Sequence, residues 1–421
     1  MPGSHQTISV EEHSARLLCL VRQLPPATLK IGPALLGAVL ASDVHAQHPL
    51  PLWDNSAMDG FAVRSADTTT ASDSAPVSLE VIGEIPAGSS RDPEIAKGQC
   101  VKIMTGAPLP TTADAVVRIE DTSAADTGWE VSSVQIKLPV AAGKDIRQRG
   151  EDKSAGDLIA LTGDELTAPR LSALAAAGAS ELTVRIAPKV AVLVTGAELR
   201  PPGQELSRGQ IPETNSLLIA GLLAESGIRA ATIVHCVDEP QAVREQLAKL
   251  APIHDAILST GGVGPGDFDV MRQVLADEPG VTATRVRVRP GQPQCAGRLA
   301  GGAMIFALPG NPVSAAASFE LFVRPALRAM QGHAQVQRPR LQAVAAVGWR
   351  AAGNRLQVLP IVFQHGDLQH GSQLQCAPAV AASRISHSVG GFGSAQGYAL
   401  VPAGIEEIHP GDTVEVLRIA P

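Results

Sequence analysis

The 421-residue chain contains few aromatic residues and no excess of basic residues. Aromatic residues make up 3% of the chain, too few for the stacking platforms that bind single-stranded nucleic acids. The 34 lysines and arginines are outnumbered by 41 aspartates and glutamates, which gives a net charge of −7. Nucleic-acid-binding proteins usually carry a basic stripe that contacts the phosphate backbone, so we expect no nucleic-acid partner.

Long hydrophobic runs and paired cysteines are also missing. No run approaches the roughly 18 apolar residues that span a bilayer, and no basic segment precedes an apolar core near residue 1. We therefore expect no membrane partner. The five cysteines occur singly, without a CxxC pair, which is typical of idle thiols in a reducing compartment. These absences predict a cytoplasmic protein.

The residue pattern of the first half of the chain changes twice, from helical to β-rich and back to helical. Helical spacing over residues 10–24 ends at two prolines, and a second helix is expected after Pro33. Residues 44–144 hold short β-rich runs separated by Gly, Pro and Asp turns, which predicts an inserted β domain. An alanine-rich helix over residues 170–177 then ends at Gly178.

From residue 189 onwards, apolar strands alternate with amphipathic helices. The expected strands cover 190–194, 231–236, 256–259 and 303–307, and the expected helices cover 217–225, 241–250, 268–276 and 313–330. This alternation is typical of a doubly wound parallel sheet that is covered by helices on both faces. The final segment returns to short strands, at 357–362, 398–401 and 413–417, which predicts a small all-β domain.

The predicted fold class is therefore α/β plus β in a multidomain chain. A central α/β domain covers residues 189–331, and a C-terminal all-β domain covers 332–421. The inserted β domain covers 44–144, and the flanking pieces 1–43 and 145–188 form a helical linking domain.

Three loops follow strands of the expected parallel sheet, where ligands bind in open α/β folds. They cover residues 195–198, 260–269 and 308–312. Their glycines allow the backbone to approach a phosphate closely, and a following helix favours negative charge. Neither a dinucleotide GxGxxG nor a P-loop motif occurs in them. Each loop alone is more often a plain turn, but three at one sheet edge favour a phosphorylated ligand.

Carboxylates accompany these loops. Asp267 and Asp269 lie in the second loop, and Asp238 follows the strand at 231–236. Mg²⁺ is commonly held by one or two carboxylates together with substrate phosphates, so this arrangement suits a magnesium site. The alternative for Asp238 and Asp269 is that each simply begins a helix.

The inserted β domain adds further candidate segments. The segment 51–63 mixes small and polar residues and is poor strand material, so an ordered loop there is a functional candidate. Segments 102–110 and 150–153, taken singly, are typical of surface turns.

Together, these segments resemble those of the molybdopterin molybdotransferase family, which includes the C-terminal domain of gephyrin. The similar segments are NSAMDGFA at 55–62, MTGAPLP at 104–110, ADAVV at 113–117, GED at 150–152, TG at 195–196, GGV at 261–263 and LPGNPVS at 308–314. They occur in the family's order and extend from about residue 10 to 418.

The resemblance implies an elongated four-part subunit that forms a homodimer, with the linking domain as the dimerisation domain. The active site would lie between the α/β domain of one subunit and the inserted β domain of the other. The implied reaction inserts molybdate into adenylylated molybdopterin in the presence of Mg²⁺ and releases AMP.

The position-by-position match assigns roles to individual residues. The implied metal ligands are Asp238 and Asp269. The implied catalytic residues are Asp59, Thr105, Asp152 and Glu198. The implied substrate-binding residues are Gly261, Gly262, Gly264, Gly266, Asp238, Arg289, Pro309, Gly310, Asn311 and Ser386.

Three positions depart from the family's pattern. Ala197 stands where the family usually has an aspartate, and Gly264 stands where it has a serine. Gln292 replaces the second lysine of a Lys-Pro-Gly-Lys-Pro turn that begins here with Arg289.

Two hypotheses about the function therefore stay open. One is an active enzyme with altered oxyanion handling, for molybdate or tungstate. The other is a non-catalytic paralogue that carries molybdopterin or finished cofactor. The retained carboxylates favour the enzyme.

Overall fold

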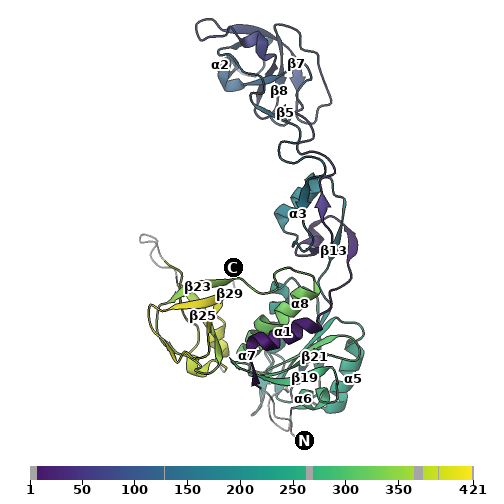
Figure 1. Ribbon diagram of the computed structural model, residues 1–421, viewed down its shortest axis with the longest axis vertical. Coiled ribbons are helices and arrows are strands. Elements are labelled where there is room, and N and C mark those ends of the chain that lie inside the picture. Colours follow the sequence, from purple (N-terminus) through teal and green to yellow (C-terminus); the bar gives the residue numbers. More distant parts are fainter. Residues whose placement is uncertain (1–6, 128, 262–268, 365–372, 387, 420–421) are drawn as a thin grey trace.

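The computed structural model of the chain describes residues 7–127, 129–261, 269–364, 373–386 and 388–419. Figure 1 shows an elongated molecule: the inserted β domain lies at one end, the linking domain in the middle, and the α/β domain at the other end. The C-terminal β domain lies beside the α/β domain. The predicted multidomain α/β plus β fold class is confirmed.

Seven strands form the sheet of the α/β domain, in the order β1-β19-β21-β22-β18-β14-β17. β14 (Val190–Thr195), β18 (Ala256–Thr260) and β22 (Met304–Leu308) are buried along their whole length, and β17 (Ala231–Cys236) forms one edge. These four strands are mutually parallel, as predicted. Their continuous apolar runs fit strands covered on both faces.

The other side of this sheet differs from the prediction of a wholly parallel sheet. β21 (Pro293–Arg298) runs antiparallel to both β22 and β19 (Val281–Val286), so the sheet is mixed. β1 (Thr7–Ile8) adds a parallel strand at the far edge. Residues 1–43 were grouped with the linking domain, but β1 and α1 (Val10–Leu20) pack on the α/β domain.

Helices cover both faces of the sheet, as a doubly wound fold requires. One face packs against α1, α4 (Asn215–Glu225) and a long helical segment. The other packs against α5 (Pro240–Leu250) and α6 (Val270–Leu275). The long segment is the predicted helix 313–330, which the structure divides into α7 (Pro312–Ser318), a π-helical turn (Phe319–Val323) and α8 (Arg324–Met330).

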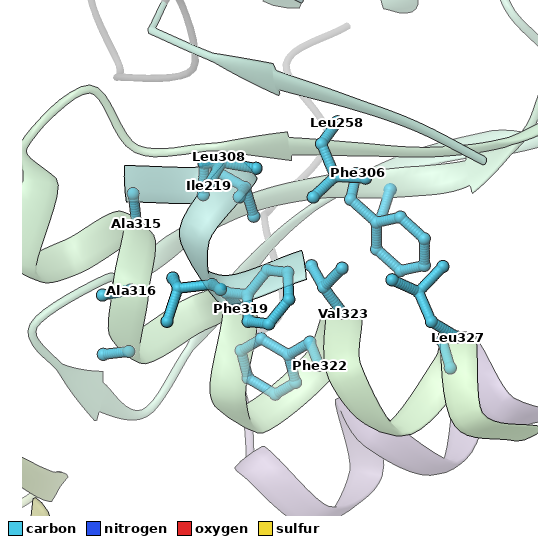
Figure 2. Close-up of a cluster of buried hydrophobic side chains, with 14 of the residues drawn as sticks. Ile219, Leu258, Phe306, Leu308, Ala315, Ala316, Phe319, Phe322, Val323 and Leu327 are labelled. Atoms are coloured by element: carbon cyan, nitrogen blue, oxygen red, sulfur yellow. The ribbon is translucent and has the colours of Figure 1, made fainter. Parts of the chain in front are cut away.

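Aromatic packing fixes the long helical segment on the sheet. Figure 2 shows Phe319 and Phe322 of the π-helical turn in one cluster with Phe306 of β22, and all three are buried. Burying a phenylalanine side chain contributes about 1.5–3 kcal/mol. The loop that precedes α7 is therefore carried on a rigid base.

The inserted β domain contains a five-stranded sheet in the order β10-β7-β8-β6-β9. The short β-rich runs predicted within residues 44–144 do form strands. The strands are β6 (Gly60–Val63), β7 (Val77–Ile85), β8 (Gln99–Ile103), β9 (Ala115–Arg118) and β10 (Ser133–Ile136).

The linking domain joins segments from before and after the inserted domain. β13 (Glu181–Arg185) pairs with β2 (Ala27–Lys30) and β3 (Val39–Leu40). β4 (Val44–His45) pairs with β12 (Leu158–Ala160), and α3 (Ala168–Ala176) lies beside them.

The helix predicted after Pro33 is wrong. Only a short 3₁₀ turn forms (Pro33–Leu35), and Gly37, at φ 83°, turns the chain into β3. Val39 and Leu40 then pair with Arg185 and Val184, a contact between residues distant in sequence. Non-local strand pairing therefore overrides the local helical spacing.

The C-terminal domain is a six-stranded sheet in the order β20-β25-β26-β23-β29-β27. Its strands are β20 (Val288–Arg289), β23 (Arg340–Ala345), β25 (Leu356–Gln364), β26 (Gln375–Pro378), β27 (Gly397–Val401) and β29 (Thr413–Arg418). β20 comes from the α/β domain and ties the two domains together. Across the described ranges, the helices are all too short or too polar to cross a bilayer.

Candidate functional site

The carboxyl ends of β14 and β18 mark the point where the strand order of the central sheet reverses. From β14 the chain proceeds to β17 on one side, and β18 then pairs with the other side of β14. Ligands in open α/β folds bind in the crevice at such a point. The first and second predicted loops both start here.

Thr195 and Asp238 meet at this edge. Thr195 is the last residue of β14, and its Oγ1 hydroxyl donates a hydrogen bond to Asp238 Oδ1. Asp238 follows β17 and lines a cavity of about 560 Å³ together with Gly196, Ala197 and Cys236. Oδ2 of Asp238 makes no hydrogen bond with the described residues, so this oxygen is available to a ligand.

Two other residues near this cavity, Glu198 and Cys236, are less suited than Asp238 to contact a ligand or to react. Glu198 is exposed and lies outside the lining of the cavity, and its backbone carbonyl accepts a hydrogen bond from Ile211 N–H at 3.0 Å. Burial, and then the Asp238 carboxylate, raise the pKa of the Cys236 thiol. The thiol therefore stays protonated near neutral pH and is a weak nucleophile.

Gly261 and Gly310 bring the second and third loops into contact. Gly261 has φ +91°, and a Cβ there would lie 3.2 Å from the Thr195 carbonyl oxygen. Its N–H donates to the Leu308 carbonyl at 3.2 Å. A Cβ on Gly310 would lie 3.4 Å from Gly261 Cα. The three loop starts are thus packed backbone against backbone.

Sequence reasoning missed a set of polar side chains beneath these loops. Asn215, the first residue of α4, donates from Nδ2 to the Gly310 carbonyl at 2.7 Å. Its Oδ1, Ser259 Oγ and Thr260 Oγ1 are buried and have no hydrogen-bond partner among the described residues. Unpartnered buried polar atoms are rare and are typical of sites that await a ligand or water. The only feature of the local sequence that could have indicated Asn215 was the polar triplet 213–215 ahead of an apolar helix.

The third loop leads directly into α7. Pro309 is buried, whereas Gly310 and Asn311 are exposed, and Asn311 is the N-cap residue of α7. Its carbonyl accepts the Ala315 N–H at 2.9 Å. The N–H groups of the first helical turn therefore lie next to the exposed part of this loop.

Several predicted residues lie outside the described ranges. They are Gly262, Gly264, Gly266 and Asp267. Asp269 is described and is the N-cap residue of α6, although its side chain makes no capping hydrogen bond there. Within the described ranges, His, Cys, Asp and Glu side chains form no group of three or more that could hold a metal ion.

In the inserted β domain, Asp59 and Thr105 form one unit. Asp59 Oδ1 accepts the Thr105 backbone N–H at 2.7 Å and the Thr105 hydroxyl at 2.9 Å. Asp59 precedes β6, and Thr105 follows β8, which is antiparallel to β6. The strand pairing therefore brings two sequence motifs, 46 residues apart, to one point.

Backbone hydrogen bonds add Asp152 to the same region. β5 (Asn55–Ser56) pairs with β11 (Ile146–Arg147), and Asn55 also bridges to Pro108. Asp152 N–H donates to the Leu50 carbonyl at 3.0 Å. Segments 50–59, 104–109 and 146–153 are thus held side by side. The candidate residues Asp59, Thr105 and Asp152 therefore lie in one region of the inserted β domain.

The two groups of candidate residues are far apart within one chain. Figure 1 places β5 and β8 at one end of the molecule and the α/β domain at the other, with the linking domain between them. One chain therefore does not bring Asp59, Thr105 and Asp152 to the loops around Gly261.

Arg289 lines a separate cavity of about 400 Å³ at the junction with the C-terminal domain. Arg350, Ser383 and Glu406 line the same cavity. The Arg289 guanidinium donates from Nη2 to the Ser383 carbonyl at 3.3 Å. Arg350 is a second cation that sequence reasoning missed, because nothing in its local sequence marks it.

The turn that follows Arg289 connects this cavity with α7. A Cβ on Gly291 would lie 2.8 Å from Ser318 Oγ of α7 and 3.4 Å from the Ser314 carbonyl. Gln292 is partly exposed. Ser386 lies beyond the 3₁₀ turn Ala382–Arg384, which borders the cavity, and is not itself among the lining residues.

Comparisons with protein families cover nearly the whole chain. Residues 8–178 match the MoeA N-terminal region (domain I and II). Residues 191–329 match a probable molybdopterin binding domain, and residues 342–419 match the MoeA C-terminal region (domain IV).

Comparisons with individual proteins agree with these family matches. Molybdopterin molybdenumtransferase 2 of Mycobacterium tuberculosis is 36% identical over 414 residues, which cover 97% of this chain and 98% of that protein. A molybdopterin molybdenumtransferase of Staphylococcus aureus is 33% identical over 334 residues, 78% of this chain and 77% of that protein. The crystal structure of a molybdopterin biosynthesis MoeA protein from Pyrococcus horikoshii has a TM-score of 0.80 at 26% identity and covers 98% of this chain and 100% of that chain.

Proposed function

The chain belongs to the molybdopterin molybdenumtransferase family, and from this premise we propose which of its residues bind the substrates and carry the reaction. It is a transferase of molybdenum cofactor biosynthesis. The reaction we propose joins molybdate to the dithiolene of adenylylated molybdopterin and releases AMP.

The pyrophosphate of the substrate would bind between the second and third loops. The observation that carries this proposal is the contact between Gly261 and Gly310, beside the cavity lined by Asp238. Glycines leave room for a phosphate against the backbone, and the N-terminus of α7 favours its negative charge. The unpartnered Asn215 Oδ1 and Thr260 Oγ1 would hydrogen-bond the ligand or its water. Pro309 and Asn311 would shape the loop.

The donor chemistry of this edge fits Mg²⁺. Mg²⁺ needs only one or two protein carboxylates when substrate phosphates complete its shell, so a group of three protein ligands is not required. Asp238 is oriented by the Thr195 hydroxyl and keeps Oδ2 open, and Asp269 stands ahead of α6 in the neighbouring loop. When bound, Mg²⁺ would offset the charge that develops on the phosphates. Thr195 would fix the direction of the Asp238 carboxylate.

Molybdate would bind in the cavity at the junction with the C-terminal domain. Arg289 and Arg350 line this cavity, and guanidinium groups bind oxyanions well. Ser386 lies three residues after Ser383, which borders the cavity. Tungstate has the same shape and charge, so this site would accept it too. Gln292 supplies no cation, which leaves the two arginines as the main positive groups.

The inserted β domain of a second copy would complete the site. Asp59 is held by Thr105 and cannot reach the Gly261 loop of its own chain. A homodimer would bring Asp59, Thr105 and Asp152 of one subunit to the α/β domain of the other. The linking domain exposes large apolar side chains that suit such contacts: Leu29, Leu36, Leu158, Leu161 and Ile186. Glu198, exposed beside the first loop, would face the incoming domain.

A cytoplasmic location completes the proposal. All five cysteines are free thiols in the structure, and three of them are buried. Unpaired thiols suit a reducing compartment. The alternative of a non-catalytic carrier is not favoured, because the relatives that cover the chain are named as transferases.

The experiment is to incubate the purified chain with adenylylated molybdopterin, Mg²⁺ and either molybdate or tungstate, and to follow AMP release. We expect AMP to be released with Mg²⁺ and an oxyanion, and not when either is left out. Binding of the pterin without AMP release under any of these conditions would overturn the proposed reaction and support the carrier.

A further inference from the structure

A third cavity lies at the edge of the central sheet opposite to the loops discussed above. Its volume is about 290 Å³, near the lower end of the usual range for small-molecule sites. Its walls come from the segment after α1, the chain between α5 and β18, the turn between β21 and β22, and the end of α8. These are the amino ends of β18 and β22, so the cavity is separate from the proposed pyrophosphate site.

Two arginines line this cavity without an acidic partner. Arg298 donates from Nη1 to the Gly302 carbonyl and from Nη2 to the Leu20 carbonyl, both at 2.5 Å, and is thereby fixed in place. Arg22 makes no hydrogen bond or ion pair with the described residues. Burial, and then the charge of Arg22, lower the pKa of Arg298. The two like charges therefore repel one another across the cavity.

Two other polar side chains of the cavity, those of Asp255 and His254, already make hydrogen bonds. Asp255 Oδ2 accepts the Lys189 N–H at 2.8 Å, and Asp255 forms no ion pair with either arginine. His254 uses both ring nitrogens, Nδ1 towards the Leu250 carbonyl and Nε2 towards Thr232 Oγ1, each at 3.0 Å. The cavity is thus lined by two guanidinium groups and one carboxylate, and that carboxylate pairs with neither of them.

We propose that this cavity binds a small tetrahedral dianion of the phosphate type between Arg22 and Arg298. Guanidinium groups present paired N–H donors that match phosphate oxygens, and a dianion would offset the repulsion between the two arginines. The volume accommodates an inorganic phosphate or a small phosphate ester. Arg298 supplies the fixed donor, and Arg22 closes onto the ligand.

The same cavity borders the junction between the α/β domain and the linking domain. Leu24, which lines it, donates its N–H to the Met330 carbonyl at 2.7 Å and accepts a hydrogen bond from Arg185 Nε at 3.1 Å. Arg185 belongs to β13 of the linking domain. Holding Arg22 by a ligand therefore restrains the segment that joins the two domains.

Hydrogen exchange of the full chain, measured by mass spectrometry, tests this site locally. The probe is inorganic phosphate, compared with chloride at equal ionic strength. We expect slower exchange in peptides that cover residues 20–26, 251–256 and 298–303. Protection around Gly261 reports the proposed pyrophosphate site separately, so the two sites are read independently.

The decisive variant is R22Q, because Arg22 makes no hydrogen bond or ion pair with the described residues. Loss of one charge-assisted contact should raise the phosphate concentration for half-maximal protection about tenfold. The matched control is R229Q, which removes the same charge from an exposed arginine elsewhere on the domain and should leave the protection unchanged. Absence of protection in the three peptides of the unmodified chain, or equal protection in R22Q, would overturn the proposal.

Discussion

The carboxylate of Asp59 accepts both of the hydrogen bonds that Thr105 can donate to it, one from the backbone and one from the hydroxyl. Both end on Oδ1, at 2.7 and 2.9 Å, and Oδ2 has no hydrogen bond with the described residues. Thr105 therefore sets the direction of the carboxylate and leaves Oδ2 open to a further partner.

This pair makes a graded prediction. D59N should lower the rate constant of AMP release about 100-fold or more, because the proposed contact with the reacting groups loses its charge. T105A keeps the backbone hydrogen bond but loses the other one, so we expect a loss of about tenfold, since hydrogen bonds to charged groups contribute about 1.5–3 kcal/mol. T105S restores the hydroxyl and should restore the rate. Equal rates for T105A and T105S would refute the positioning role.

The Thr195–Asp238 hydrogen bond predicts a change in the Mg²⁺ requirement. D238N should raise the Mg²⁺ concentration for half-maximal AMP release strongly. T195V should raise it about tenfold, because a residue that orients a metal ligand typically affects metal affinity by that amount. A Mg²⁺ titration of the activity measures both. D277N, at an exposed carboxylate paired with Arg244, is the control and should titrate normally. An unchanged titration for D238N would remove Asp238 from the proposed metal site.

The proposal that two subunits share each active site predicts complementation between inactive variants. D59N and D269N should each be inactive as homodimers. In a mixed dimer one of the two sites keeps both native residues, so coexpression should restore about a quarter of the native activity if the subunits pair at random. Failure of the mixture to gain activity, with mixed dimers demonstrated by differently tagged subunits, would show that one chain forms the site alone.

The contact between Gly261 and Gly310 predicts a selective effect of added methyl groups. G261A places a Cβ 3.2 Å from the Thr195 carbonyl in a left-handed backbone conformation, so we expect the loop to shift and the KM for the pterin substrate to rise at least about tenfold. G227A is a matched control, because Gly227 also has a positive φ, +86°, with nothing within 4 Å of the added Cβ. It should cost about 1 kcal/mol of stability and leave KM unchanged.

His13 predicts a loss of stability in mild acid. Its side chain is buried, its Nε2 has no partner among the described residues, and its ring packs edge-on against Phe322 at 4.7 Å. Burial, and then Arg16, lower the pKa of His13 from 6.5 to about 4. The unfolded chain therefore binds this proton first, and stability falls as the pH drops from about 6.5 towards 4.

Urea unfolding at pH 7.5 and pH 5 measures this contribution. H13L should reduce the loss of unfolding free energy between the two pH values by about 2 kcal/mol. His333, whose pKa burial also lowers to about 4, accounts for a further part in both proteins. H409L, which removes an exposed histidine, is the matched control. A pH dependence that H13L does not change would contradict the assignment.

The parts of the fold that the sequence predicted are those in which burial dictates the residue pattern. The apolar runs of β14, β18 and β22 are buried on both faces, so their amino-acid sequences alone identify them as core strands. β19 and β21 were missed, because their polar residues break the apolar run. β3 was mistaken for helix, because its pairing with β13 depends on residues far along the chain.

The candidate site divides in the same way. Asp59 and Thr105 were predicted as site residues from sequence motifs, but the hydrogen bonds between them depend on the pairing of β6 with β8. Asn215 and Arg350 carry no motif, and only the packing of their elements brings them to Gly310 and Arg289. Contacts between distant elements cannot be deduced from the identity of single residues.

The elongated shape also bears on how the reaction rate depends on the concentration of the chain. If each working site draws its halves from two chains, then in dilute solution, where most chains are single, the rate per volume rises with the square of the chain concentration. Doubling the expression of the gene would then quadruple the flux through this step. At high concentration every chain is paired, and the dependence becomes linear.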